Sequence, residues 1–495
     1  MIFNSVDFAI FFVIVFVLYW FAAKDNMRLQ NLILLTSSYF FYAYWDWRFL
    51  FLLVFISLAN FYIGLLLGKR GAIKYPNIWF IIGLILNIGI LSYFKYFNFF
   101  ISGFIKIFSE IGVTLEINPL RIILPLGISF YIFLSISYLI DIYQGRLKPC
   151  QNIFDALLTF SFFPILLAGP IQRPVSLLPQ IQSRRAFNYS KAVTGLKQIL
   201  WGLFMKIVIA DRCAIHVNDI FQNYTYYSGS TLMTGSIFFT IQVYADFAGY
   251  SLIAIGISGL LGFDLMNNFS YPYFARSIAD FWKRWHISLT TWFRDYIFLP
   301  VSYKISRRIK REKLWFIKTD IIIYILGITT TWILTGLWHG GNYTFIVWGL
   351  INGFFLILYH IARKPRNVFM KKIHINKENL IIIGLERLYI IVIILLFWIF
   401  FRADSLEQAN GYLSRIFDKS FFTIPHFANL DKAITTTALI IVFLILEWIG
   451  RDNQFALAKI GATWRRPYRY TVYYLIIFAI FWFGGKEQQF IYFQF

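Results

Sequence analysis

Residues 321–361 read IIIYILGITTTWILTGLWHGGNYTFIVWGLINGFFLILYHI, which are two apolar runs joined by a short polar link at 339–342. Each run, 321–338 and 343–361, comes close to the roughly 20 apolar residues that a helix needs to cross a bilayer core. The pair therefore predicts two membrane-spanning helices that return the chain to the side from which it started.

Basic residues gather on both sides of this pair. Seven Lys or Arg residues fall in 302–319 and six in 361–379, and a further cluster of five lies in 451–469. Loops rich in Lys and Arg remain on the cytoplasmic side of a membrane protein, so all three segments are predicted to face the cytoplasm.

A cytoplasmic basic loop can have two roles. It can set the topology and attract anionic lipid headgroups, or it can bind the phosphates of an anionic substrate. The first role accounts for most such loops. Arg307, Arg308 and Lys310 are the candidates for the second role, as a binding site for a phosphate-bearing donor.

The composition of the whole chain agrees with a membrane protein. Apolar residue types make up 59% of the 495 residues and charged types 14%, whereas soluble domains carry roughly 25% charged residues. With a mean hydropathy of +0.64, soluble, disordered and disulfide-stapled chains are excluded. The formal net charge of +22 does not indicate nucleic-acid binding, because no basic loop is long enough to form a soluble domain.

A series of apolar runs defines the expected architecture. We expect an all-α polytopic membrane protein with about 11 to 13 transmembrane or re-entrant helices, and residues 1–495 are expected to form a single membrane domain. Residues 1–23 lack a basic n-region and a cleavage site, which predicts a retained first helix. The run at 232–262 is expected to break at its glycines. The runs are 6–23, 31–45, 49–68, 78–97, 122–141, 153–169, 232–262, 321–338, 343–361, 380–401, 433–449 and 470–484.

One stretch beside these runs is too polar for a lipid-facing span and too aromatic for a free loop. It reads DFWKRWHISLTTWFRDY, residues 280–296, with His286 near its middle. We predict a single interfacial or re-entrant helix that is buried in protein, since lipid does not tolerate its charges. Asp280 is expected to pair with Arg284 one turn later.

A second histidine lies in the central pair of runs. His339 ends the first run, and Gly340 and Gly341 after it leave room for a substrate or another backbone beside the ring. An ionisable residue next to membrane-spanning helices is a functional candidate. With a pKa of about 6.5, histidine can take a proton from a hydroxyl group at neutral pH, as acyl transfer requires. A purely structural histidine is the alternative.

Motifs for other chemistries are missing from the sequence. It contains no Gly-x-Ser-x-Gly elbow, no phosphate-binding glycine loop and no HExxH pattern. A serine hydrolase, a nucleotide-driven pump and a metal site therefore have no support. The two cysteines, Cys150 and Cys213, are not spaced as metal ligands, and no permanently bound cofactor is expected.

Several motifs together resemble the membrane-bound O-acyltransferases, in the branch of the membrane subunit of bacterial alginate O-acetyltransferase. The two strongest are DFWKRWHISLTTWFRDY and LTGLWHGGNYTF, residues 334–345. Weaker matches follow in chain order over nearly the whole sequence. They are LPLGISFYIF (124–133), SYLIDIY (137–143), FFP and AGPIQR (within 162–173), FFRADSLEQA (400–409) and the terminal FIYFQF.

The resemblance implies a ring of helices around a buried tunnel in the bacterial inner membrane. It implies transfer of an acetyl group from a cytoplasmic thioester, acetyl-CoA, to an extracytoplasmic polysaccharide, with a periplasmic or surface-anchored SGNH-type acetyltransferase as partner. His339 matches the histidine regarded as catalytic in this family, and His286 matches a second motif histidine. The chain departs from the family pattern at Asn352, often histidine, at Ile165, often Gln, and at Leu252, often Asp.

Two alternative functions remain open. The first is transfer of D-alanyl or another acyl group to teichoic acid from a carrier-protein thioester, although the matches at 400–409 and at the terminus favour the acetyltransferase branch. The second is a polysaccharide flippase or transporter. Transporters of this kind typically show broken helices in two related halves, and no such pair is visible in the sequence.

Overall fold

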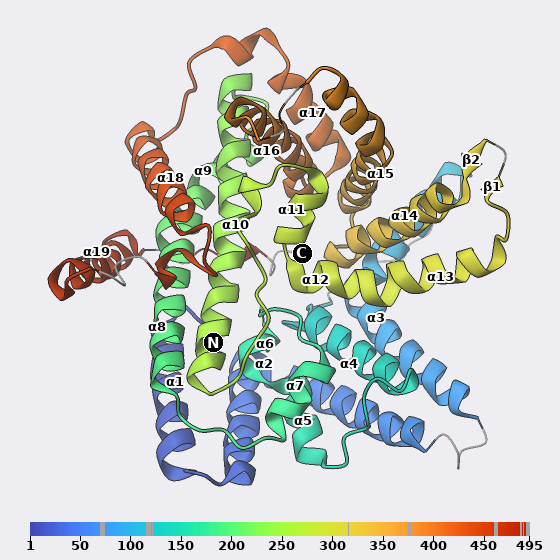
Figure 1. Cartoon of the computed structure of the whole chain (residues 1–495), viewed down its shortest axis with the longest axis vertical. Coiled ribbons are helices and arrows are strands. Elements are labelled where there is room, and N and C mark those ends of the chain that lie inside the picture. The colour runs from blue at the N-terminus through green and yellow to red at the C-terminus, as the bar shows by residue number, and fades with distance from the viewer. Residues whose placement is uncertain are drawn as a thin grey trace. The chain divides into compact units, whose positions relative to one another are not determined.

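The computed structural model describes residues 1–69, 75–114, 120, 122–167, 169–314, 316–374, 376, 378–459, 464–485, 488, 490 and 491. The chain divides into two compact units. The first comprises Met1–Leu203 with Tyr250–Met266, and the second comprises Phe204–Gly249 with Asn267–Phe495. Figure 1 shows that the described elements are helices apart from one short hairpin.

The first unit contains long apolar helices and several short ones. The runs 31–45 and 49–68 form one element that bends where Asp46 leaves helical geometry (φ −159°, ψ 108°). The span predicted at 153–169 is wrong, because the helix stops at a non-helical Phe162 and Pro164 lies in the first turn of a new short helix. The elements are α1 (Val6–Val17), η1 (Leu18–Ala22), α2 (Met27–Gly68), α3 (Pro76–Glu110), α4 (Ile128–Tyr143), α5 (Ile153–Ser161), α6 (Phe163–Leu166), α7 (Pro174–Ile181) and α8 (Tyr189–Leu203).

Helix α10 (Gly229–Leu260) contributes residues to both units. The second unit contains the segments with the candidate site residues. Its other elements are η2 (Phe204–Ala210), α9 (Asp211–Gln222), η3 (Pro272–Phe274), α11 (Ile278–Arg284), α12 (Ile287–Phe293), η4 (Arg294–Phe298), α13 (Leu299–Arg308), β1 (Lys313–Leu314), β2 (Ile317–Lys318), α14 (Thr319–His339), α15 (Tyr343–Lys372), α16 (Leu380–Arg402), α17 (Leu406–Ile416), η5 (Lys419–Phe422), α18 (Leu430–Gly450), η6 (Ala456–Ala458) and α19 (Arg466–Phe483).

Eight helices in the described part of the chain are long and apolar enough to cross a membrane. They confirm an all-α polytopic membrane protein. The stretches Val6–Ala22 and Ile128–Tyr143 are apolar but shorter. The run at 232–262 does not break at its glycines, contrary to the prediction, since α10 is one continuous helix. The ring of helices around a tunnel stays a prediction.

The central pair of apolar runs forms α14 and α15, which lie side by side (Figure 1). Two glycines allow this close approach. A β-carbon at Gly336 would overlap the carbonyl oxygen of Phe345, and a β-carbon at Gly349 would overlap that of Trp332. Small residues at a helix contact are typical of membrane proteins, where backbone packing drives association. The contact fixes the end of α14 that carries His339.

Replacing Gly336 with alanine is expected to destabilise the protein. The new methyl group meets a backbone carbonyl that cannot rotate away, and overpacking of this kind costs about 1–3 kcal/mol. Gly384→Ala on α16 is the matched control, because nothing lies within 4 Å of its added β-carbon. We expect thermal unfolding of the purified protein to show a lower Tm for Gly336→Ala and no decrease for Gly384→Ala. Equal Tm values would contradict the close packing of α14 on α15.

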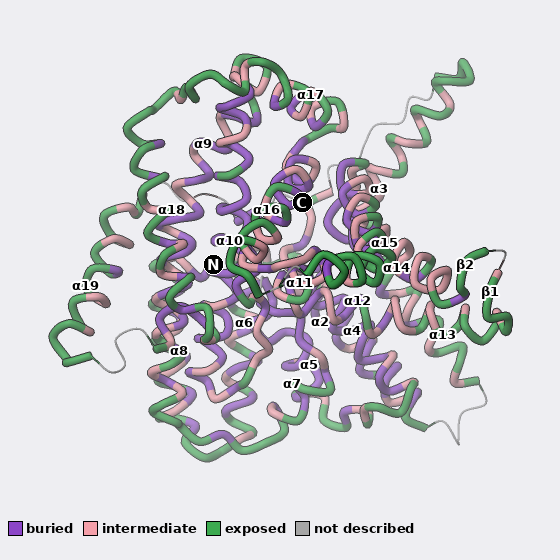
Figure 2. Tube along the Cα trace, turned by 45° about the horizontal axis from the view of Figure 1, so that its top comes forward, coloured by how far each residue is buried: buried purple, intermediate pink, exposed green. Residues whose placement is uncertain are grey.

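The two basic segments at 302–319 and 361–379, which were predicted as loops, contain regular secondary structure. Residues 302–319 include the end of α13 and the antiparallel hairpin of β1 and β2, and α15 continues to Lys372. Figure 2 shows that the hairpin and much of α13 are exposed. Two candidate spans, α14 and α15, separate the two basic segments. Two crossings return the chain to the side from which it started, which agrees with the prediction that both basic segments lie on one side of the membrane.

Candidate active site

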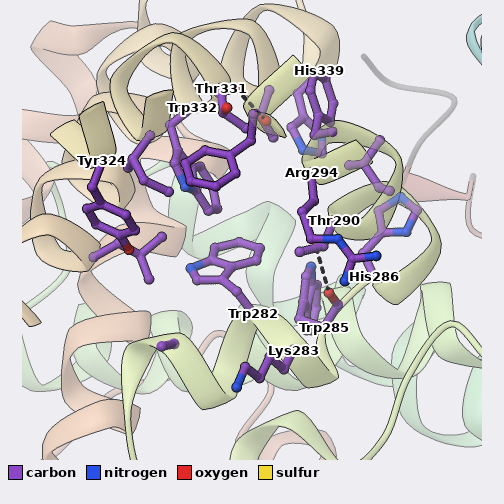
Figure 3. Close-up of a pocket in the computed structure, with 17 residues that line it drawn as sticks. Trp282, Lys283, Trp285, His286, Thr290, Arg294, Tyr324, Thr331, Trp332 and His339 are labelled. Atoms are coloured by element: carbon purple, nitrogen blue, oxygen red, sulfur yellow. Dashed lines mark hydrogen bonds between the residues drawn. The ribbon is translucent and has the colours of Figure 1, made fainter. Parts of the chain in front are cut away.

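A cavity of about 360 Å³ lies inside the second unit (Figure 3). Helices α11, α12 and α14 and the π-helical turn η4 form most of its wall. Most of the lining is aromatic or aliphatic, with threonines, two histidines and two cations among it. The lining residues are Ala279, Trp282, Lys283, Trp285, His286, Leu289, Thr290, Phe293, Arg294, Phe298, Tyr324, Ile328, Thr331, Trp332, Thr335, His339 and Leu356.

The cavity follows α14 along its length. Tyr324, Ile328, Thr331, Thr335 and His339 line it at helical spacing. The fifteen steps of helical rise between Tyr324 and His339 correspond to about 22 Å along the helix axis. The cavity therefore has a histidine end and an opposite end near the start of α14, where the basic hairpin precedes the helix.

The facing wall runs antiparallel to α14. At the histidine end, the His286 ring centroid lies 6.0 Å from that of Trp338. At the opposite end, the Phe298 ring lies 6.1 Å from that of Tyr324. Figure 3 shows His286, like His339, far from Tyr324. The fold thus brings the two predicted site histidines to the same end of one cavity.

His339 is the last residue of α14 and is almost completely buried, with a relative exposure of 4%. Its ring centroid lies 4.8 Å from Trp338, 5.0 Å from Trp348 and 4.9 Å from Phe401. Gly340 makes room for this arrangement, because a β-carbon there would come within 2.5 Å of the Phe345 ring. The space expected beside the glycine is therefore filled by an aromatic side chain and not by a second backbone.

His286 interrupts the stretch predicted as a single helix over 280–296. Its backbone is left-handed (φ 43°, ψ 53°) and divides the stretch into α11 and α12. Histidine adopts this geometry more readily than most residues other than glycine. The prediction of one helix is therefore wrong, whereas the Asp280–Arg284 ion pair within it is confirmed at 2.8 Å.

Asn268 determines which nitrogen of His286 carries the proton. The Asn268 Oδ1 atom lies 2.9 Å from His286 Nδ1 and accepts hydrogen bonds from the Ser288 amide and hydroxyl. Because a backbone amide can only donate, this Asn268 atom is the oxygen, so Nδ1 is protonated and Nε2 is not. Burial lowers the pKa of His286 well below its ordinary value. The ring is therefore neutral at physiological pH.

Two cations of the lining were not predicted as site residues. Lys283 and Arg294 both line the cavity, but isolated basic residues in an aromatic stretch carry no recognisable pattern. The predicted phosphate ligands Arg307, Arg308 and Lys310 are exposed at and just beyond the end of α13, and they do not line the cavity.

Asn352, one of the positions at which the chain departs from the pattern that the resemblance implies, does not line the cavity. Its side chain is fully buried, and its Nδ2 donates to the Trp348 carbonyl oxygen at 2.8 Å, one turn earlier on α15. No group of His, Cys, Asp or Glu side chains that could hold a metal ion occurs among the residues that the structure describes.

Fold and site together define a polytopic helical membrane protein with two buried histidines at one end of an apolar cavity. The family profile described as MBOAT, membrane-bound O-acyltransferase family, matches residues 153–402, which include both histidines. The chain belongs to the membrane-bound O-acyltransferase family and is an acyltransferase.

Curated relatives differ in the polymer that their names specify. The chain is 33% identical to the probable alginate O-acetylase AlgI of Azotobacter vinelandii, over 93% of this chain and 87% of the relative. It is 29% identical to the peptidoglycan O-acetyltransferase of Helicobacter pylori, over 96% and 93%. The teichoic acid D-alanyltransferase of Bacillus subtilis is also 29% identical, but over only 50% of this chain and 61% of the relative.

Proposed function

We propose that the protein transfers an acetyl group from acetyl-CoA in the cytoplasm to an extracytoplasmic polysaccharide across the bacterial inner membrane. The observation that carries the proposal is the cavity, which extends about 22 Å along α14 from near its basic-flanked start to His339. A thioester that enters at the basic end can reach the histidine end through one continuous, mostly apolar space.

His339 is the general base in this proposal. It removes the proton of an acceptor hydroxyl as the oxygen attacks the thioester carbonyl carbon. The resulting tetrahedral intermediate collapses, the carbon–sulfur bond breaks, and the imidazolium returns the proton to the departing sulfur. The aromatic rings of Trp338, Trp348 and Phe401, all within 5.0 Å of the His339 ring centroid, exclude water that would otherwise hydrolyse the thioester.

His286 is proposed to position the donor rather than to polarise its carbonyl group. With the Nδ1 proton directed to Asn268, the neutral ring has a lone pair at Nε2. A lone pair can accept a hydrogen bond from an N–H or O–H group of the donor, but it cannot donate one to a developing oxyanion. Arg294 lines the same cavity. Its Nε pairs with Asp295 at 2.7 Å, and its terminal N–H groups are proposed to donate to that oxygen.

Recognition of the donor phosphates is proposed at the other end of the cavity. Helix α13 follows Phe298, which packs on Tyr324 there, and the exposed Arg307 and Arg308 lie in its last turn. Together with Lys310 they present cations to the phosphates of coenzyme A.

The acceptor and partner are also part of the proposal. The alginate and peptidoglycan O-acetylating relatives support a polysaccharide acceptor, and an SGNH-type transferase outside the membrane is proposed to pass the acetyl group to it. Similarity over 93% of this chain to the Azotobacter relative supports treating residues 1–495 as one functional membrane domain.

The proposed donor side requires both basic segments to face the cytoplasm. A cysteine introduced at Arg308 and another at Lys372 are expected to resist membrane-impermeant thiol reagents in intact cells, and to react once the membrane is permeabilised. The reason is that seven and six basic residues in 302–319 and 361–379 hold these segments inside. Labelling of either cysteine from outside would contradict the predicted topology, and the basic end of the cavity could then not receive a cytoplasmic donor.

A donor assay tests the proposed reaction directly. Membranes containing the protein and its acceptor are given acetyl-CoA labelled in the acetyl group, or a D-alanyl carrier protein labelled in the amino acid. We expect an alkali-labile ester from acetyl-CoA, with release of free thiol. A product from the carrier protein alone would establish the second candidate, D-alanyl transfer, which the Bacillus relative favours. Movement of glycan without ester formation would establish a transporter.

A further inference from the structure

A second cavity, of about 290 Å³, lies between α15, α16 and the segment that leads into α11. We call it the arginine groove, because Arg276, Arg363 and Arg366 line it. None of its lining residues lines the cavity that contains the two histidines. The groove is therefore a separate feature that acyl transfer at His339 does not use.

The charges of the groove are arranged around a single acid. Glu386 of α16 pairs with Arg276 at 2.9 Å and with Arg366 at 3.0 Å, which holds both guanidinium groups at the wall. The exposed Arg363 takes part in neither pair. Three arginines against one glutamate in the lining leave an excess of positive charge, which an anionic ligand would balance.

Further cations surround the groove. Arg276, Arg284 and Arg451 repel the guanidinium of Arg387, the residue that follows Glu386 on α16, and Asp280, which pairs with Arg284, is the acid that attracts it. Arg276 also contacts Glu378 at 3.4 Å, but that carboxylate is 75% exposed, so water screens its contribution. The local field is therefore positive beyond the lining residues themselves.

The rest of the groove is apolar. Phe355, Leu358, Ile390 and Ile393 form one part of its lining, and Leu358 is 43% exposed. On α15 the long continuous apolar run ends just before Arg363, and the polar segment 363–367, which contains Pro365 and Arg366, follows it. This change from apolar to basic marks the level of the membrane surface, where tyrosines such as the groove's Tyr389 are also enriched.

We propose that the arginine groove binds one anionic phospholipid on the cytoplasmic side, with its phosphate at Arg363 and Arg366 and its acyl chains along the apolar part of the groove. Basic pockets between transmembrane helices on this side bind acidic lipid headgroups. The apolar lining favours a lipid over the phosphates of coenzyme A, which have no hydrocarbon chains to cover it.

The test uses the purified full-length protein in detergent, titrated with phosphatidylglycerol and, separately, with phosphatidylcholine. Bound lipid is counted by native mass spectrometry. Arg363→Gln removes one cation without breaking an ion pair of Glu386. Lys364→Gln is the matched control, because it removes the same charge from the neighbouring position on α15, which does not line the groove. A third titration adds coenzyme A.

We expect phosphatidylglycerol to bind the wild type in preference to phosphatidylcholine. Arg363→Gln should weaken this binding about five-fold, the effect of losing one cation at a membrane surface, and Lys364→Gln should leave it unchanged. Equal effects of the two variants would show that the lipid binds to a diffuse basic surface and not to the arginine groove, which would overturn the proposal. No effect of Arg363→Gln, or displacement of the lipid by coenzyme A, would overturn it as well.

Discussion

His339→Gln is expected to produce a folded protein that has lost O-acetylation. Glutamine retains a hydrogen-bonding side chain but cannot accept a proton near neutral pH. The loss of a general base costs about 10²- to 10⁴-fold in rate, or roughly 3 to 5 kcal/mol of activation free energy. The measurement is the content of alkali-labile acetyl ester in the polymer, normalised to the amount of protein in the membrane.

A structural histidine would behave differently. Its loss typically costs about 0.5–3 kcal/mol of stability and lowers the protein level or Tm. His426→Gln is the control for the substitution itself, because His426 is exposed and its ring does not line the cavity. If His339→Gln kept more than about a tenth of the wild-type rate, above what remains after loss of a base, His339 would be a structural residue.

Asparagine and glutamine at position 286 are expected to separate two roles of the second histidine. An asparagine amide can take over the Nδ1–H bond to Asn268 and suits the left-handed backbone at this position (φ 43°). It places nothing at the position of Nε2, whereas a glutamine side chain reaches that position with an oxygen that can accept a hydrogen bond.

We therefore expect His286→Asn to fold normally and to lose about 10- to 100-fold in kcat/KM, the effect of one lost buried hydrogen bond to the donor. His286→Gln should retain more activity than His286→Asn. Steady-state kinetics with acetyl-CoA provide the comparison. Equal and complete inactivation of both variants would show that position 286 transfers a proton instead of accepting a hydrogen bond.

Asn268→Asp is expected to change the pH dependence of activity through His286. Burial lowers the pKa of His286, so the ring in the folded protein stays neutral until the pH falls to that lowered value. The stability that the neutral ring contributes is fully present above the ordinary histidine pKa, and it is lost as the pH falls through the lowered pKa. A carboxylate at position 268 favours the protonated ring and raises that pKa. The acid limb of the activity profile should therefore move to higher pH in Asn268→Asp, and an unchanged limb would contradict the assigned proton position.

Hydropathy predicted the parts of the fold that depend on long apolar runs. The run at 321–338 became α14, Thr319–His339, with almost the predicted bounds. The same reasoning failed at α10, where glycines were expected to break a helix. Gly256 is instead a contact point, since its β-carbon would come within 2.5 Å of the Gly195 carbonyl oxygen. Composition alone does not distinguish a glycine that ends a helix from one that packs against a neighbour.

The candidate site was predicted only in part for a similar reason. His339 and His286 stood out because ionisable residues beside apolar runs are rare. Nothing in the local pattern indicated that the backbone turns left-handed at His286, or that Asn268 hydrogen-bonds to its ring. Both features depend on contacts between segments, and helical periodicity does not encode such contacts.

In the proposed reaction, acetyl groups cross from a cytoplasmic thioester to an acceptor on the other side of the membrane with the help of His339. This transfer is tested with sealed membrane vesicles of both orientations, prepared from cells that make the protein and its acceptor. The vesicles are supplied from outside with acetyl-CoA labelled in the acetyl group. We expect wild-type inside-out vesicles to form labelled ester in their lumen, and right-side-out vesicles or His339→Gln vesicles to form none. Equal labelling in both orientations, or labelling that persists in His339→Gln, would contradict transfer across the membrane with His339 as the base.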